Sequence, residues 1–232
     1  MTSVNGIDAR DLEWPGCHNV RDLGGLPVAG GGTTVRGRIV RADNLDRLTD
    51  AGWRALWDYG VRTVIDLRNE EECRTDVVRP DGLELVRVPF DAYATAEWIE
   101  EWYPPGLPNN FGRFLEDYPQ AAVDFGKAIG DAAPDGVVVV HCAAGRDRTG
   151  LASMLLLAHA GVDRELIAAD YEHSVNRLRE SLLTTGKDDD DDDMADPTPA
   201  QLDEIRGRVR VFLDGLRPEE FFDEAVRARI VH

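Results

Sequence analysis

A cysteine, two arginines and a threonine lie close together in the segment His141–Gly150, at a spacing suited to attack on a phosphate ester. Cys142 follows an apolar run, and an apolar helical pattern begins soon after it. The unpaired N–H groups of such a loop and of the first helical turn attract an anion. Arg148 could hold two oxygens of that anion. The same field favours the thiolate of Cys142, so we expect attack on phosphorus and a phosphocysteine intermediate.

The segments around this loop are predicted to be a buried strand and a helix. Val137–Val140 is a run of four valines, which is typical of a central strand covered on both faces. Further strands are predicted at Gly37–Asp43, Val61–Leu67 and Leu83–Phe90. Because helical patterns alternate with these strands, we expect an α/β fold with a central, mainly parallel sheet flanked by helices on both faces. Ligands bind beyond the carboxyl ends of such strands, which is where Cys142 lies.

Several helix boundaries have capping signals. Thr49 is a predicted N-cap, and Pro119 suits the first turn of a helix. Asp163 is predicted to cap another helix, and Thr198–Gln201 reads as a capping box. A last helix is expected to begin near Pro218.

The composition excludes several classes of protein. The 232 residues include 44 acidic and 26 basic side chains, a net charge of −18, which argues against nonspecific binding to nucleic acid or to an anionic membrane. No apolar run is long enough to span a membrane, and no standard secretory signal is visible, so a cytoplasmic location is expected. The three cysteines, Cys17, Cys73 and Cys142, suit neither a disulfide framework nor a metal site.

Two motifs resemble known phosphatases. His141–Gly150 is similar to the Cys-x5-Arg-Thr signature of protein tyrosine phosphatases, and Asn19–Gly25 resembles the opening of the bacterial atypical, mycobacterial PtpB-like group. The segments 38–43, 64–68 and 161–171 fit the same family, so the resemblance covers roughly residues 14–183. It implies a tyrosine phosphatase-like fold. No cofactor is expected, because the anion-binding loop and the thiolate supply the chemistry themselves. The implied partners are phosphorylated proteins or peptides bearing phosphotyrosine, with phosphoserine and phosphothreonine as further substrates. Members of this group can be secreted without a standard signal.

The motif assigns roles to individual residues. Cys142 is the expected nucleophile, and Arg148 is expected to bind the equatorial oxygens and stabilise the transition state. Thr149 is expected to donate to the thiolate, and His141 to orient the loop through hydrogen bonds. The expected phosphate-binding residues are Ala143, Ala144, Gly145, Arg146, Asp147, Arg148 and Thr149.

The general acid has two candidates, because the acid must reach the mouth of the loop to protonate the leaving oxygen. In the resembling family an Asp inside the loop is proposed, which corresponds to Asp147. An Asp after an earlier strand, as in dual-specificity phosphatases, corresponds to Asp91. Asp66 is expected to support the site by holding Arg148 or Arg68.

One position departs from the resembling family, in which a lysine usually stands at the place of Arg146. Because that lysine is linked to phosphoinositide headgroups, a phosphoinositide phosphatase is the alternative enzyme. A catalytically silent phosphate-binding module is a third hypothesis, from a different class.

The chain is expected to form a short arm over residues 1–13 and a single phosphatase domain over residues 14–232. The acidic residues 187–196 are expected to form a flexible insertion, because like charges repel and stay solvated. The resemblance implies that the helical region around them, about residues 175–215, is a lid over the site.

The aromatic residues near position 100, the pair Arg21 and Asp22, and two further cysteines also give predictions. Trp98, Trp102 and Tyr103 either line an aryl-phosphate pocket or form a packed cluster. The neighbours Arg21 and Asp22 are predicted to form a salt bridge that fixes the N-terminal segment, with support of the active site as the alternative. Cys17 or Cys73 could form a disulfide with an oxidised Cys142.

Overall fold

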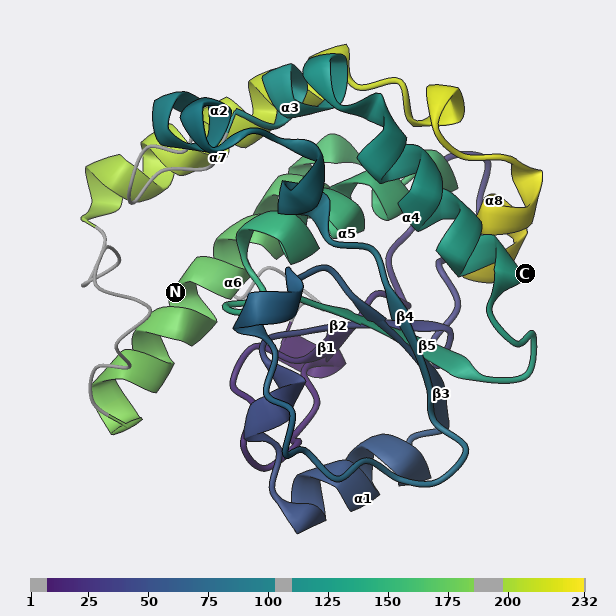
Figure 1. Ribbon diagram of the computed structural model, residues 1–232. Helices are drawn as coiled ribbons and strands as arrows, with labels where there is room; N and C mark the ends of the chain where they lie inside the picture. The colour runs from purple at the N-terminus through teal and green to yellow at the C-terminus, as the bar shows by residue number, and fades with distance from the viewer. Residues whose placement is uncertain (1–7, 103–109, 186–197, 232) are drawn as a thin grey trace.

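The computed structural model describes residues 8–102, 110–185 and 198–231, and a five-stranded sheet forms its centre (Figure 1). The strand order is β1-β2-β5-β3-β4, with β1 antiparallel to β2 and the other neighbours parallel. The strands are β1 (Arg21–Asp22), β2 (Ile39–Ala42), β3 (Val61–Asp66), β4 (Glu84–Arg87) and β5 (Val137–His141). The predicted mainly parallel sheet is confirmed, and β5 is its central strand.

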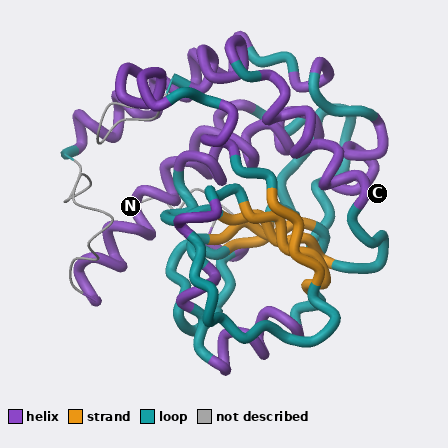
Figure 2. Tube along the Cα trace, viewed as in Figure 1, coloured by secondary structure: helices purple, strands orange, loops and turns teal. Residues whose placement is uncertain are grey.

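Helices cover both faces of the sheet, with α1 on one side and the larger helical layer on the other (Figures 1 and 2). The α-helices are α1 (Asp50–Asp58), α2 (Ala96–Trp102), α3 (Phe111–Asp117), α4 (Pro119–Asp131), α5 (Asp147–Ala160), α6 (Arg164–Thr185), α7 (Pro199–Gly215) and α8 (Glu224–Val231). Short 3-10 helices lie between them: η1 (Asp8–Arg10), η2 (Leu45–Arg47), η3 (Glu70–Glu72), η4 (Phe90–Tyr93) and η5 (Pro218–Glu220).

The four valines of β5 explain why this strand lies at the centre. Successive side chains of a strand point to opposite faces, so an unbroken apolar run fills both sides. The first and third residues of Val137–Val140 pack in a smaller apolar cluster that includes Trp53 and Leu56 of α1. The second and fourth pack in a larger core that includes Phe125 of α4 and Leu155 of α5. The strand and the loop after it are thus fixed from both faces.

The capping signals identify the helix starts well. The Thr49 side chain accepts from the backbone N–H of Gly52, and both hydrogen bonds of the capping box at Thr198 and Gln201 are present. The predicted start of the last helix, near Pro218, is wrong. Only the turn η5 forms there, and α8 begins at Glu224.

The segment before α3 folds back onto the core. Trp98 of α2 packs edge-on against Phe114 and Tyr118, and its indole N–H donates to Asp117 over 2.8 Å. Trp98 therefore belongs to a packed aromatic cluster, one of the two predicted alternatives. The side chain of Trp102, and Tyr103, lie outside the described residues.

The structure describes only part of the predicted N-terminal arm and none of the predicted acidic insertion. The acidic residues 187–196 lie outside the described residues. Of the expected N-terminal arm, residues 8–13 are described, and the Arg10 side chain in this part is buried and paired with Asp170.

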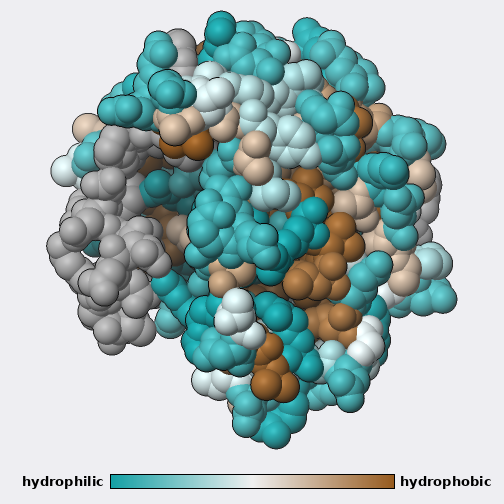
Figure 3. Space-filling model, viewed as in Figure 1, coloured by the Kyte–Doolittle hydropathy of each residue, from teal (hydrophilic) through white to brown (hydrophobic). Residues whose placement is uncertain are grey.

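The surface seen in Figure 3 is mostly hydrophilic, with a band of apolar residues in the region where Figure 1 draws β4. This edge strand exposes Glu84 and Arg87, and charged residues on an edge discourage pairing with another chain. No helix within the described ranges is long and apolar enough to cross a membrane.

Replacing Phe125 tests the larger core. Its ring is fully buried and lies 5.9 Å from the rings of both Phe90 and Phe222, measured between centroids. We expect Phe125→Ala to lower the free energy of unfolding by about 3–5 kcal/mol in urea titrations, because the core cannot close the cavity. Val123→Ala, on the exposed side of the same helix, is the control and should cost under about 0.5 kcal/mol. Equal losses in the two variants would contradict this description of the core.

Candidate active site

The loop of residues 142–146 leaves the carboxyl end of β5 and leads directly into α5. His141, the last residue of β5, pairs in register with Ala42 of β2 and Asp66 of β3, so three strand ends meet at this place. Cys142 is only 2% exposed. The cysteine therefore lies at the base of the loop, beside the N-terminus of a helix that favours negative charge.

Gly145 allows the loop to approach the end of β2. Its φ of +68° lies in the left-handed region, which residues with a Cβ rarely adopt. A Cβ built at this position would lie 2.7 Å from the carbonyl oxygen of Ala42 and 2.8 Å from the backbone nitrogen of Asp43. Both the conformation and the close approach therefore require glycine here.

Hydrogen-bond donors hold the carbonyl groups of the loop. The backbone N–H of Asn44 donates to Ala143 O over 3.0 Å. The side-chain amide of Asn19 donates to the carbonyl oxygens of Ala144 (3.2 Å) and Gly145 (3.1 Å). The guanidinium group of Arg41 also donates to Gly145 O, over 2.5 Å. In a planar trans peptide the next N–H points the opposite way. The following N–H groups are thus directed away from these donors, as an anion-binding loop requires.

Two carboxylates hold Arg148 from the opposite side of the loop. Its terminal nitrogens contact the two carboxylate oxygens of Glu72 over 2.6 and 2.7 Å, and one also lies 3.1 Å from Asp91 Oδ2. Burial lowers the pKa of Arg148, but the Glu72 hydrogen bonds and the charges of Cys142 and Asp91 outweigh it and raise the pKa above its usual range. The guanidinium is therefore ordered and permanently charged beside the loop.

Asp147 and Asp91, the two acid candidates, lie in different surroundings. The carboxylate of Asp147 accepts from Arg146 Nε over 3.1 Å and from the Tyr171 hydroxyl over 2.9 Å. Asp91 lies on η4 and contacts Arg148 as described above. Both carboxylates are thus close to the loop, one on α5 itself and the other across from it.

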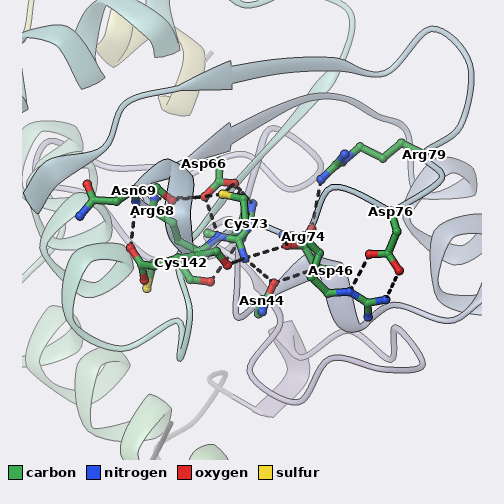
Figure 4. Close-up of polar contacts among 12 residues, drawn as sticks. Asn44, Asp46, Asp66, Arg68, Asn69, Cys73, Arg74, Asp76, Arg79 and Cys142 are labelled. Atoms are coloured by element: carbon green, nitrogen blue, oxygen red, sulfur yellow. Dashed lines mark hydrogen bonds and ion pairs between the residues drawn. The ribbon is translucent and has the colours of Figure 1, made fainter. Parts of the chain in front are cut away.

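Asp66 pairs with Arg68, which is one of its two predicted partners. Nε and NH2 of Arg68 contact the two carboxylate oxygens over 2.9 and 2.8 Å, and NH1 reaches Asp46 and Asn44 (Figure 4). Burial raises the pKa of Asp66, but the Arg68 hydrogen bonds and nearby positive charge outweigh it and lower the pKa to about 2. The pair fixes the end of β3 beside Cys142.

His141 is buried between β3 and the loop. Its Nδ1 lies 3.3 Å from Cys142 O, and its Nε2 lies 3.6 Å from Asp66 Oδ2. Burial lowers the pKa of His141 to about 4, despite the opposing charge of Asp66. A neutral imidazole in contact with the loop backbone suits the predicted orienting role.

The expected hydrogen bond from Thr149 to the thiolate is not formed in this structure. Its hydroxyl oxygen is buried and makes no hydrogen bond, although the residue follows Arg148 in the first turn of α5. The three cysteines are free, and the thiols of Cys17 and Cys73 lie against carbonyl oxygens of Asn44 and Asn69. In the described ranges, no group of three or more His, Cys, Asp or Glu side chains is placed to hold a metal ion.

The predicted Arg21–Asp22 salt bridge is wrong. Adjacent residues of a strand point to opposite faces, so each side chain finds a distant partner. Arg21 pairs with Asp170 of α6, whereas Asp22 accepts from the Tyr59 hydroxyl and from the backbone N–H groups of Gly24 and Gly37.

Sequence reasoning assigned no role to Glu72, Arg41, Asn19 or Asp170. Glu72 lies among exposed acidic neighbours, so nothing in its local pattern marks it. Arg41 offers a signal, because an arginine within a short apolar strand must be paired if it is buried. Its partner is 129 residues away along the chain and could not be named from that pattern.

Comparisons with known proteins extend over most of the described fold. The family model described as the tyrosine phosphatase family matches residues 12–224. The triple specificity protein phosphatase PtpB of Mycobacterium tuberculosis is 33% identical over 201 residues, which cover 72% of this chain and 71% of that protein. A tyrosine-protein phosphatase of Nostoc commune is 32% identical over 171 residues, which cover 71% of this chain and 55% of that protein.

The buried His141 predicts a loss of stability in acid. Its pKa is about 4 in the folded chain and about 6.5 when exposed, so the unfolded chain binds the proton first as the pH falls. Its contribution is complete above pH 6.5 and is lost down to pH 4, by at most about 3 kcal/mol. We expect His141→Asn to flatten the dependence of the unfolding free energy on pH in this window.

The control is Ser153→Ala, a buried change on α5 that adds and removes no titrating group. It should lower stability without changing the slope. Identical slopes in wild type and His141→Asn would show that folding does not lower the pKa of His141.

Proposed function

Since the chain belongs to the tyrosine phosphatase family and is therefore a phosphate-ester hydrolase, we propose that it hydrolyses phosphotyrosine through a phosphocysteine intermediate on Cys142. The family assignment confirms the resemblance of the sequence motifs. The observation that carries the mechanism is the position of Cys142, at the base of a loop whose carbonyl groups are bound on one side and whose neighbour Arg148 is charged and ordered.

In the first step, the Cys142 thiolate attacks phosphorus and the ester P–O bond breaks. Arg148 and the N–H groups of residues 143–149 stabilise the negative charge on the equatorial oxygens. A carboxylic acid gives its proton to the departing phenolate oxygen, so that tyrosine leaves as the neutral phenol.

In the second step, water attacks the phosphocysteine and the S–P bond breaks. The same carboxylate takes a proton from the water, which returns the acid to its starting form and releases inorganic phosphate. No external oxidant, reductant or metal ion enters this sequence.

We propose Asp147 as the acid, with Asp91 as the alternative. Asp147 belongs to the loop–helix junction, and its hydrogen bond from Tyr171 fixes its position. Asp91 is supported by its contact with Arg148, which places it near the oxygens of a bound phosphate. In the supporting set, His141 and Asp66 fix the strand ends behind Cys142.

The proposed substrates are phosphotyrosine proteins or peptides, with phosphoserine and phosphothreonine as further substrates. The name of the mycobacterial relative, a triple specificity phosphatase, favours more than one substrate class. A phosphoinositide is the alternative substrate, for which Arg146 would supply extra positive charge. The net charge of −18 disfavours approach to an anionic membrane.

Replacing Cys142 tests the nucleophile and the substrate class. We expect wild type to release phosphate fastest from a phosphotyrosine peptide, compared with phosphoserine and phosphothreonine peptides and a soluble phosphoinositide. Cys142→Ser should lower turnover on the order of 10³-fold or more while the protein still binds the phosphotyrosine peptide. Cys17→Ser is the control for the same substitution outside the loop and should retain turnover.

Three outcomes would contradict this proposal. A Cys142→Ser variant with full turnover would remove the phosphocysteine intermediate. A wild type that binds phosphopeptide without turnover would instead support the silent binding module, and fastest release from the phosphoinositide would support the alternative substrate.

The acid is tested by comparing Asp147→Asn with Asp91→Asn. The variant that lacks the acid should lose the basic limb of the pH–rate profile and fall in rate by about 10²–10⁴-fold. Its loss should be larger for phenyl phosphate than for 4-nitrophenyl phosphate, because a poorer leaving group needs the proton more. A variant that only disturbs Arg148 should slow both esters equally. If neither variant loses the basic limb, both assignments are wrong.

A further inference from the structure

A buried cluster of charged residues lies behind the loop. The carboxylate of Asp170, on α6, contacts three guanidinium groups, those of Arg10 (2.6 Å), Arg21 (2.9 Å) and Arg41 (2.8 Å). The exposed fraction of each of these four side chains is 2% or less. Such a cluster is costly to bury, and it has a net charge of about +2 at neutral pH. This cost suggests a role beyond holding the fold together.

The cluster reaches the loop through two of its arginines. Arg41 contacts Asp170 with one terminal nitrogen and donates to Gly145 O with the other. Arg21 donates from NH1 to the amide oxygen of Asn19 over 2.9 Å, which directs the NH₂ group of that amide toward the loop. The amide then donates to the carbonyl oxygens of Ala144 and Gly145.

Asn19 is also fixed through its backbone. Its N–H donates to the carboxylate of Asp43 over 3.0 Å, just after β2. The residue is fully buried, so its side chain has few alternative positions. Backbone and side chain together therefore hold the NH₂ group against the loop.

These contacts decide which way two peptide groups of the loop face. If the carbonyl oxygens of Ala144 and Gly145 lost their donors, either peptide could rotate, and Gly145 is the residue most tolerant of such a rotation. A rotated peptide would present a partial negative charge to a bound phosphate in place of an N–H group. The donors behind the loop remove this competing arrangement.

We propose that Asn19 and Arg41, tethered through Arg21 and Asp170, are positioning residues that hold two loop carbonyls back and thereby aim the N–H groups of Gly145 and Arg146 at the phosphate. This inference rests on the proposed function for its catalytic consequence. Its consequence for binding requires only that the loop takes a phosphate anion.

The charge of Arg41 supports this role. Burial and the charge of Arg21 lower the pKa of Arg41 to about 10, while Asp170 and Cys142 oppose the shift. Arg41 therefore keeps its proton at neutral pH, and it lies near enough to Cys142 to interact with a thiolate. A charged donor also makes a stronger hydrogen bond to Gly145 O than a neutral one.

The test compares Asn19→Ala and Arg41→Lys with a matched control, Ser174→Ala. Ser174 is buried on α6 and accepts from Arg21 over 2.7 Å, so its loss disturbs the same cluster without touching the loop. For each protein we would measure the melting temperature, kcat and KM for 4-nitrophenyl phosphate, and the dissociation constant of inorganic phosphate by calorimetry.

Both loop-facing variants should lower kcat/KM by about 10- to 100-fold, by analogy with the loss of residues that orient a binding group. They should also weaken phosphate binding. Ser174→Ala should keep kcat/KM and the dissociation constant of phosphate within about twofold of wild type, at a melting temperature similar to that of the loop-facing variants. The proposal is overturned if either folded loop-facing variant binds phosphate and turns over as wild type does. It is equally overturned if Ser174→Ala loses as much as they do.

The design separates this inference from the proposed function. If wild type binds phosphate but hydrolyses no ester, the proposed function is wrong, and weaker phosphate binding by Asn19→Ala would still support the positioning role. If wild type is active and Asn19→Ala equals it, only the positioning role is wrong. Should Asn19→Ala fail to fold, Arg41→Lys, which retains the buried charge, decides the question.

Discussion

An anion-binding loop can direct its N–H groups to one side only if its carbonyl groups find donors on the other. In this chain the donors lie more than about 90 residues before the loop in the sequence: Asn19 before β1, Arg41 in β2 and the backbone of Asn44 after β2. The strand order places β2 beside β5, which brings these donors under the loop. The parallel sheet, its short N-terminal strand and α6 thus serve one local geometric requirement.

The same requirement explains why charged side chains that are costly to bury lie behind the loop. A guanidinium can contact a carboxylate and a carbonyl at once, because its donors point in several directions within one plane. A lysine or an amide in the place of Arg41 could not span from Asp170 to Gly145 O as rigidly. Asp170 in turn gives one shared carboxylate to three buried guanidinium groups.

The sequence predicted features that depend on neighbouring residues and missed those that depend on distant ones. Four valines in a row placed β5 at the centre, and Thr49 and Thr198 marked helix starts, because strand alternation and capping act over a few residues. The loop with Cys142 and Arg148 was recognisable for the same reason. The bond from Arg21 to Asp170 was not, since charge alone pointed to the adjacent Asp22 and only the fold reveals the opposite faces.

On the other side of the loop, carboxylates orient Arg148. Glu72 holds both terminal nitrogens, so the guanidinium is oriented before any substrate arrives and little side-chain entropy is lost on binding. Asp91 contacts the same group, so two carboxylates face one guanidinium. In the proposed mechanism, a phosphate dianion would meet an ordered guanidinium that is already paired with carboxylates. This pairing would weaken the hold of Arg148 on inorganic phosphate, and the proposed arrangement therefore favours release of the product after each turnover.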